Sequence, residues 1–287
     1  MSDPGHPYAG RTAVLATMHR KESVIAPALR ATPGLIVEPV PGLDTDRFGT
    51  FSGEIARNGT MLEVAVRKAR LGMNAGGAAL GLATEGSFGP HPMIPFLPAG
   101  MELMVFVDDE RGIVVTESLI AETTNFAHMV VRSDEMPTAF LQRIGFPDHG
   151  LIVRPNDGEE TEGLAKGVID HDGLTRAIMA AAAVSRDGQA RLETDMRAHF
   201  NPTRMNSLAV LAERLGRRLA RRCPACGMPG FGRTGDHPGL PCEACGDPTD
   251  LVAAEIFGCP ACDFTEDRPR ADGLVRSPAQ YCPTCNP

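Results

Sequence analysis

The chain has 287 residues, of which 43% are hydrophobic, and its formal net charge is −8. This length predicts about two domains, and the lack of an apolar run of about 18 residues argues against a membrane-spanning helix. Residues 1–10 are polar and rich in proline and glycine, without the charged and then apolar layout of a secretory signal. We therefore expect a disordered lead-in over residues 1–10 and a cytoplasmic protein without membrane contact.

Short β-type and helical runs alternate over residues 11–189, which predicts an α/β domain with a mixed sheet and helices on its faces. The expected strands are residues 12–17, 35–40, 79–84, 102–108, 112–118, 126–131, 150–154 and 167–170. The expected helices are residues 22–31, 61–74, 134–144 and 173–185, and residues 156–163 form an acidic loop.

Residues 190–222 are expected to form a helical connector, because leucines from Leu208 to Leu219 recur at helical spacing. Five arginines lie on the same stretch: Arg214, Arg217, Arg218, Arg221 and Arg222. A solvated arginine face is the favoured interpretation, and contact with nucleic acid is the alternative.

Residues 17–21 (TMHRK) form the first of four polar segments, between the first expected strand and the first helix. Ligands of open α/β sheets bind at the carboxyl ends of strands, and a helix N-terminus offers free N–H groups to an anion. Lys21 and His19 would add charge-assisted contacts to a phosphate. The alternative is a solvated, well-capped turn.

The second polar segment is the loop at residues 44–54, which combines Asp44, Asp46 and Arg47 with several hydroxyl groups. Such a loop can hold a hydrated Mg2+ ion and a polyphosphate, although an ordinary polar loop also uses Asp and Ser for local turns. The third segment places Glu63 on one helix flank with two arginines, which a simple ion pair would also explain.

The fourth polar segment, residues 84–92, follows an apolar strand and contains two glycines and two prolines. It predicts a rigid loop that carries Glu85, Ser87 and His91, and loops on a scaffold often carry the functional site. The stretch reads EGSFG and lacks the leading glycine of a G-x-S-x-G nucleophile elbow. We therefore expect a functional loop here but no serine hydrolase triad.

All eight cysteines lie after residue 222, in four C-x-x-C pairs: Cys223/Cys226, Cys242/Cys245, Cys259/Cys262 and Cys282/Cys285. Two such pairs brought together complete a tetrahedral four-thiolate zinc site. Residues 223–287 are therefore predicted to be a zinc-ribbon module with two structural Zn2+ ions. Disulfides would need an oxidising compartment, and an iron–sulfur cluster is a minor alternative.

Spacing alone leaves the pairing of the four cysteine pairs open, because sequential, nested and crossed pairings use the same residues. From Cys223 onward the chain has four arginines and nine acidic residues, and two four-thiolate zinc sites would add about −4. Phosphate binding relies on a basic surface. A protein partner therefore suits this module better than nucleic acid.

The segments ATMHRKESVIAPAL, DTDRFGTFSGEIAR, ATEGSFGPHP and CPTCNP together resemble an uncharacterised bacterial family, a domain of unknown function with paired C-terminal zinc ribbons. This resemblance covers nearly the whole chain and implies no activity.

Residues 12–155 also resemble, more distantly, the inosine/xanthosine triphosphate pyrophosphatase superfamily. The likeness is carried by a strand ending in Ala-Thr with a lysine nearby, then E-x-A-x-x-K-A, then a strand ending in an acidic loop. It implies that Lys21 contacts phosphates and that Lys68 is a second phosphate contact. It also implies that Glu63 and Glu85 hold Mg2+ and activate water. His19 stands where this superfamily usually has asparagine.

The leading hypothesis is a metal-dependent hydrolase of nucleoside triphosphates or other phosphoesters. Glu63 and Glu85 would hold Mg2+ with help from Asp44 or Asp46, and the metal would lower the pKa of a bound water. Lys21, Arg47 and Lys68 would neutralise developing charge, Ser87 and His19 would contact the substrate, and His91 would be the general acid or base.

The rival hypothesis is a non-catalytic nucleotide- or anion-binding domain, whose zinc module docks a protein or nucleic-acid partner. The hydrolase hypothesis requires Lys21 and Glu85 to meet on one face of the sheet.

Overall fold

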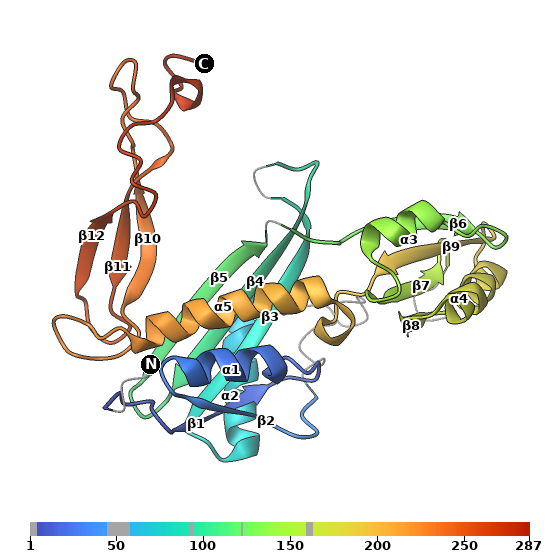
Figure 1. Ribbon diagram of the computed structural model, residues 1–287, viewed down its shortest axis with the longest axis horizontal. Coiled ribbons are helices and arrows are strands. Elements are labelled where there is room, and N and C mark those ends of the chain that lie inside the picture. The colour runs from blue at the N-terminus through green and yellow to red at the C-terminus, as the bar shows by residue number, and fades with distance from the viewer. Residues whose placement is uncertain (1–4, 45–57, 92–93, 122, 159–162) are drawn as a thin grey trace. The chain divides into compact units, whose positions relative to one another are not determined.

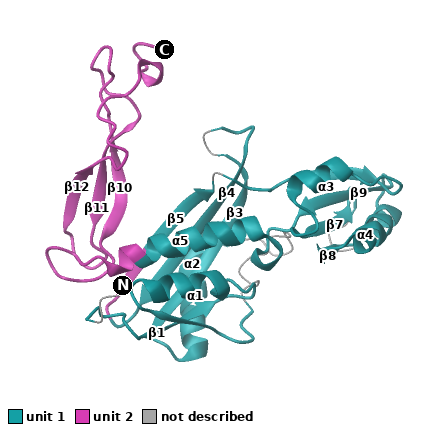
Figure 2. Ribbon diagram, in the orientation of Figure 1, with its two compact units in different colours: residues 1–110, 116–216 teal, residues 111–115, 217–287 magenta. Residues whose placement is uncertain are grey.

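The computed structural model describes residues 5–44, 58–91, 94–121, 123–158 and 163–287. Asp46 and Arg47, two of the predicted site residues, lie outside the described residues. None of the helices within these ranges is both long enough and apolar enough to cross a membrane. The chain divides into two compact units (Figure 2): residues 1–110 with 116–216, and residues 111–115 with 217–287.

The first sheet has five strands: β1 (Thr12–Ala16), β2 (Ile36–Pro39), β3 (Leu80–Pro90), β4 (Pro98–Asp108) and β5 (Ile113–Ala121). Their order is β2-β1-β3-β4-β5 (Figure 1). Strand β1 is parallel to both β2 and β3, and β4 is antiparallel to β3. The predicted mixed sheet is thereby confirmed.

Helix α2 (Met61–Gly76) packs on one face of this sheet, where Ala65 and Ala69 share a core cluster with Ala83 of β3. The helix starts where it does because the Thr60 side chain accepts a hydrogen bond from the Glu63 N–H, while the Glu63 carboxylate accepts one from the Thr60 N–H. This capping box satisfies two amide groups that would otherwise lack partners.

Helices α1 (Glu22–Ala31) and α5 (Pro202–Ala220) lie on the viewer's side of the sheet in Figure 1. They are in close contact: a Cβ atom at Gly216 would lie 2.3 Å from the carbonyl oxygen of Thr32, directly after α1. Glycine at this position therefore sets how near α5 approaches α1.

The hairpin of β3 and β4 is longer than expected, because the predicted rigid loop at residues 84–92 is a strand as far as Pro90. Pairing continues in register from Leu80 opposite Asp108 to Pro90 opposite Pro98. The ring of Phe88 covers Gly100 on the facing strand, where a Cβ atom would lie 2.7 Å from the Phe88 ring. Cross-strand packing of this kind overrides the local turn preference of glycine and proline.

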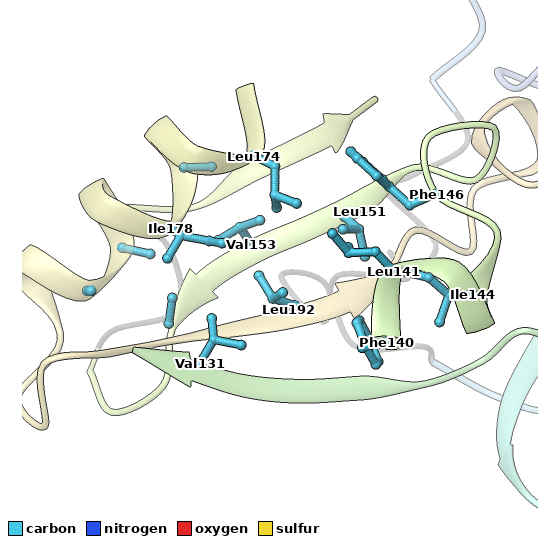
Figure 3. Packing of buried hydrophobic residues seen from close by; sticks show 14 residues of the cluster. Val131, Phe140, Leu141, Ile144, Phe146, Leu151, Val153, Leu174, Ile178 and Leu192 are labelled. Atoms are coloured by element: carbon cyan, nitrogen blue, oxygen red, sulfur yellow. The ribbon is translucent and has the colours of Figure 1, made fainter. Parts of the chain in front are cut away.

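A second, antiparallel sheet in the order β6-β9-β7-β8 follows the first. Its elements are β6 (His128–Arg132), α3 (Thr138–Ile144), β7 (Leu151–Pro155), β8 (Ala165–Val168), α4 (His171–Val184) and β9 (Gln189–Thr194). Helices α3 and α4 contribute to one core with Val153 and Leu192, which are fully buried (Figure 3). Burial of each such side chain contributes roughly 1.5–3 kcal/mol.

Two segments differ from their expected structure. Residues 190–222 begin inside strand β9 and continue through a short 3-10 helix (Ala198–Phe200) before α5. In the expected lead-in, Tyr8 is fully buried, and its hydroxyl donates a hydrogen bond of 2.9 Å to the carboxylate of Asp108.

The last part of the chain forms a three-stranded antiparallel sheet in the order β10-β11-β12. Its elements are β10 (Gly232–Pro238), β11 (Val252–Gly258), β12 (Thr265–Pro269) and a 3-10 helix (Ala279–Tyr281). Each strand lies between two successive C-x-x-C pairs in the sequence.

Candidate functional site

The eight cysteines form two groups of four, which we name thiol site A and thiol site B. Site A contains Cys223, Cys226, Cys259 and Cys262, and site B contains Cys242, Cys245, Cys282 and Cys285. Within each group, the Sγ atoms all lie within 4.8 Å of one another. The pairing is therefore crossed: the first pair meets the third, and the second meets the fourth.

The distances between sulfur atoms fit a tetrahedral metal site. They are 3.5 Å for Cys226–Cys262 and 3.9 Å for Cys223–Cys262 in site A, and 3.6 Å for Cys245–Cys282 in site B. Four sulfurs at about 2.3 Å from a zinc ion would be about 3.8 Å apart, whereas a disulfide needs about 2.05 Å. Both groups are consistent with structural zinc sites, and two such sites suggest two zinc ions.

Backbone groups of each turn support the thiolates. The N–H groups of Gly227 and Gly246 donate to the carbonyl oxygens of Cys223 and Cys242, and both glycines have positive φ, 73° and 81°. Hydrogen bonds from the backbone of Cys245 and Ala244 lower the pKa of the Cys242 thiol to about 7. Backbone N–H groups therefore favour a thiolate at the first cysteine of this turn, and the thiolate is the form that binds metal.

Site A is backed by aromatic rings, since Phe231, Phe257 and Phe264 pack with its cysteines. The guanidinium of Arg268 lies 4.4 Å from the centre of the Phe257 ring. His237 lies on β10, and its Nε2 is 3.2 Å from a carboxylate oxygen of Asp267. It belongs to neither thiol group.

A second candidate site is the buried Lys21, just beyond the end of β1. Its ammonium donates a hydrogen bond of 2.7 Å to the Thr84 hydroxyl, and the residue is only 7% exposed. Ala16, the last residue of β1, pairs with Ala83. Strand β3 continues past this point to Pro90, so Lys21 lies beyond the carboxyl end of β1 and beside the middle of β3. Burial, together with the positive charge of Arg204, lowers the pKa of Lys21 to about 7.

The charged groups that act most strongly on the pKa of Lys21 are Arg204 of α5 and Glu102 of β4. They form an ion pair in which both side chains are 1% exposed. The Nε and one terminal nitrogen of Arg204 donate to the Glu102 carboxylate at 2.6 and 3.2 Å, and the second terminal nitrogen donates to the Met196 carbonyl. Gly86 makes room for this pair, because a Cβ atom there would lie 2.6 Å from the guanidinium. The backbone N–H of Arg204 is in turn bonded to the side chain of Asn201, which caps α5.

Lys68 and Glu85 form a second buried ion pair, with 2.5 Å between Nζ and Oε1. Ala83 faces α2, and side chains alternate along a strand, so Glu85 also faces α2 whereas Thr84 faces the opposite side. Lys21 therefore meets β3 on the face that carries Arg204, and Glu85 lies on the other face. The two predicted site residues do not meet on one face, although the charge of Glu85 still acts on the pKa of Lys21.

The carboxylates expected to hold Mg2+ are spread out. Glu63 is exposed, and its Oε2 accepts a 2.8 Å hydrogen bond from the Thr60 N–H. Asp44 lies beside a cavity of about 410 Å³ at the ends of β1 and β2, together with Thr17 and Arg20. In the described ranges, the two thiol sites are the only clusters of three or more potential metal ligands. Asp46, the remaining predicted Mg2+ ligand, lies outside those ranges.

His19 and His91 differ in their surroundings. His19 is buried and stacks on His199 at 4.9 Å between ring centres, and burial lowers its pKa to about 3, so its ring is neutral near pH 7. The Nδ1 of His91 accepts a hydrogen bond from the Ile94 N–H. His91 follows Glu85 by six residues along the hairpin, roughly 20 Å at the rise of a strand. Ser87 lines a cavity of about 370 Å³ with Met61 and Met101.

Comparison with known proteins places the chain in a family without an assigned activity. The family DUF6671, described as a domain of unknown function, matches residues 68–287. The chain belongs to this family. No curated protein and no solved structure matches it. The DUF6671 match includes Lys68, Glu85 and both thiol sites, and it begins after Lys21.

In this DUF6671 chain, sequence reasoning missed Thr84, Glu102, His199 and Arg204. Glu102 and Arg204 are a hundred residues apart in the sequence, and neither belongs to a recognisable motif. Their partnership follows from the docking of α5 on the β3–β4 hairpin. The one available signal was the polar stretch that precedes α5.

Proposed function

We propose that the α/β unit binds a phosphorylated ligand beyond the carboxyl end of β1, beside Thr84 of β3, with Lys21 as its principal contact. The observation that carries this proposal is the burial of Lys21 among a small group of charges: Arg204 and Lys68 lower its pKa, whereas Glu102 and Glu85 raise it. These five groups together carry three positive and two negative charges when Lys21 is protonated. A buried cation without a counter-charge is unfavourable. An oxyanion beside Lys21 would offset that cost.

The backbone before α1 supports an anion as the ligand. Arg20 has a φ of 56°, a conformation that non-glycine residues adopt at a cost of about 1–2 kcal/mol. No side chain caps the start of α1, where the N–H groups of Ser23 and Val24 donate to the carbonyl oxygens of Arg20 and Lys21. The positive end of the helix dipole at this start favours an anion. The cavity of about 410 Å³ beside this turn has the size of a small-molecule site.

A nucleotide is the phosphorylated ligand that we favour, because this end of the chain resembles the inosine/xanthosine triphosphate pyrophosphatase superfamily. We do not propose hydrolysis by Lys21 and Glu85 together, because these side chains lie on opposite faces of the sheet. Mg2+-dependent hydrolysis by Glu85 with Lys68, without Lys21, is the second candidate function. It is favoured by the contact between Lys68 and Glu85, the two residues to which that resemblance assigns phosphate and metal binding. For hydrolysis, Glu85 would have to exchange Lys68 for the metal.

Calorimetric titration with pyrophosphate and with nucleoside triphosphates tests the binding proposal. We expect Lys21→Met to weaken binding at least tenfold, because a charge-assisted hydrogen bond is worth about 1.5–3 kcal/mol. Lys166→Met is the matched control, since Lys166 is exposed on β8. Equal affinity in the two variants would overturn the proposal.

Release of phosphate or pyrophosphate in the presence of Mg2+ tests the second candidate function. Hydrolysis predicts that Glu85→Gln abolishes turnover while retaining ligand affinity. If the unmodified chain binds the ligand but releases no phosphate or pyrophosphate, hydrolysis is refuted and ligand binding remains the function.

We also propose that the zinc module docks a protein partner, because its nine acidic residues against four arginines disfavour phosphate backbones. An electrophoretic shift with DNA or RNA that disappears on removal of zinc would contradict this assignment.

A further inference from the structure

Among the described residues, the helices α3 and α4 pack on the same face of the second sheet. Leu192 and Val153 point into the core beneath α3 and α4, so the alternate residues Arg191, Glu193 and Arg154 point to the opposite face. There they line a cavity of about 270 Å³. Its other walls include Phe88 of β3 and Phe126, whose ring centres are 6.3 Å apart.

Two arginines lie directly opposite each other on this face, since Arg154 of β7 pairs with Arg191 of β9. Like charges in direct cross-strand positions are destabilising. Both guanidinium groups bond to Glu193: Arg191 donates through Nε at 2.7 Å, and Arg154 donates through a terminal nitrogen. Glu193 therefore holds the two arginines together instead of separating them.

Arg191 has the geometry of an oriented anion receptor. Its Nε is engaged by Glu193, and its two terminal nitrogens make no hydrogen bond within the described residues. The side chain is 35% exposed. A guanidinium whose Nε is anchored presents its remaining N–H groups as a planar fork, which matches a carboxylate or phosphate group.

The walls of the cavity suit a flat, unsaturated ring. Phe88 and Phe126 supply aromatic surface, and Ile152 and Met196 add buried apolar surface. Aromatic rings stack favourably on one another in offset geometry. A volume of about 270 Å³ lies just below the usual range of small-ligand pockets, which limits the ligand to about one ring and its substituent.

We propose that this cavity binds a small ligand that carries an oxyanion on a flat unsaturated ring. The fork of Arg191 takes the oxyanion, Glu193 orients the fork, and the rings of Phe88 and Phe126 hold the flat ring. The site lies four residues further along β3 than Thr84, roughly 13 Å at the rise of a strand. It is independent of the phosphate site proposed at Lys21.

Titration of the zinc-loaded full chain with four probes tests the proposal. Benzoate and phenyl phosphate combine a ring with an oxyanion, benzyl alcohol has the ring alone, and acetate has the anion alone. We expect benzoate or phenyl phosphate to bind at least tenfold more tightly than benzyl alcohol and acetate. The stronger of the two identifies the anion as carboxylate or phosphate. Equal binding of benzoate, phenyl phosphate and benzyl alcohol would overturn the proposal.

Variants assign the binding to Arg191. Arg191→Gln should weaken the preferred probe about tenfold, in line with the loss of a charge-assisted hydrogen bond. Arg186→Gln is the matched control. Arg186 follows α4, is exposed, and its side chain makes a 3.6 Å ion pair with Asp157. Unchanged affinity in Arg191→Gln would refute the assignment. Lys21→Met should leave the affinity for this probe unchanged. The proposal at Arg191 and the proposal at Lys21 can therefore be refuted independently of each other.

A measurement on the unmodified chain keeps the proposal testable if Arg191→Gln does not fold. The NMR signal of the Arg191 Nε–H group and the ring signals of Phe126 should both shift during titration with the preferred probe. Shifts confined to other residues would overturn the proposal. Arg191→Lys adds a second check: it keeps the charge but lacks the planar fork, so we expect it to bind the probe more weakly than the unmodified chain.

Discussion

Replacement of Cys285 by serine probes the crossed pairing of the thiol sites, because this residue belongs to site B alone. Loss of one thiolate should release the site B zinc, since closed structural sites need four ligands. The bound metal should therefore fall from two ions per chain to one. The three remaining cysteines of site B should become reactive, whereas the four cysteines of site A should stay protected.

The cost in stability follows from the segment that the zinc ion closes. Thirty-six residues separate Cys245 from Cys282, and a cross-link over a loop of this length removes roughly 4 kcal/mol of chain entropy from the unfolded state. Strand β12 lies between Cys245 and Cys282 in the sequence, and the C-terminal segment to Pro287 follows Cys282. We expect the loss to be concentrated in this part of the chain.

Alkylation followed by mass spectrometry identifies which cysteines react in the variant, and the reactive set depends on how the C-x-x-C pairs combine. With crossed pairing, Cys285→Ser exposes Cys242, Cys245 and Cys282 to the reagent. With sequential pairing, the exposed residues would instead be Cys259, Cys262 and Cys282. Reactivity at Cys259 and Cys262 with protection of Cys242 and Cys245 would refute the connectivity described above. Cys226→Ser is the reciprocal variant and should expose Cys223, Cys259 and Cys262.

Three further predictions concern the buried charges of the α/β unit. Glu102→Ala leaves Arg204 buried without its carboxylate, so the free energy of unfolding measured by urea titration should fall by about 3–5 kcal/mol. Asp109→Ala, which removes the exposed ion pair with Arg70, is the control and should change that free energy by about 1 kcal/mol or less. Gly86→Ala should destabilise the fold by about 1–3 kcal/mol, because its Cβ meets Arg204 at 2.6 Å, whereas Gly89→Ala meets nothing within 4 Å and serves as the control. Lys21 is protonated in the unfolded chain up to about its ordinary pKa of 10.5, but in the folded chain only below about 7. The unfolded state therefore binds more protons between these values, so the stability contributed by this group should rise with pH by at most about 1.4 kcal/mol per unit. Lys21→Met should remove that slope in urea titrations between pH 7 and 10, and an unchanged slope would contradict the burial of this ammonium.

The sequence by itself determined the elements whose signals are local. The four C-x-x-C pairs predicted both metal sites, because two thiolates on one tight turn are encoded within four residues. Alternating apolar runs likewise predicted the mixed sheet and the start of α2 at Met61, where Thr60 and Glu63 form the cap. Lys21 was found for a similar reason, since it directly follows the first strand.

Only the tertiary structure decided which distant residues meet. The crossed pairing of the thiol sites depends on how β10, β11 and β12 align, and spacing allows several solutions. Thr84 and Glu85 are adjacent in the sequence, yet the alternation of a strand sends them to opposite faces. The strand character of residues 84–90 depends on pairing with β4, which no local propensity reports. Arg204 joins Glu102 only because α5 docks on the hairpin, a contact that burial and packing determine once the whole chain has folded.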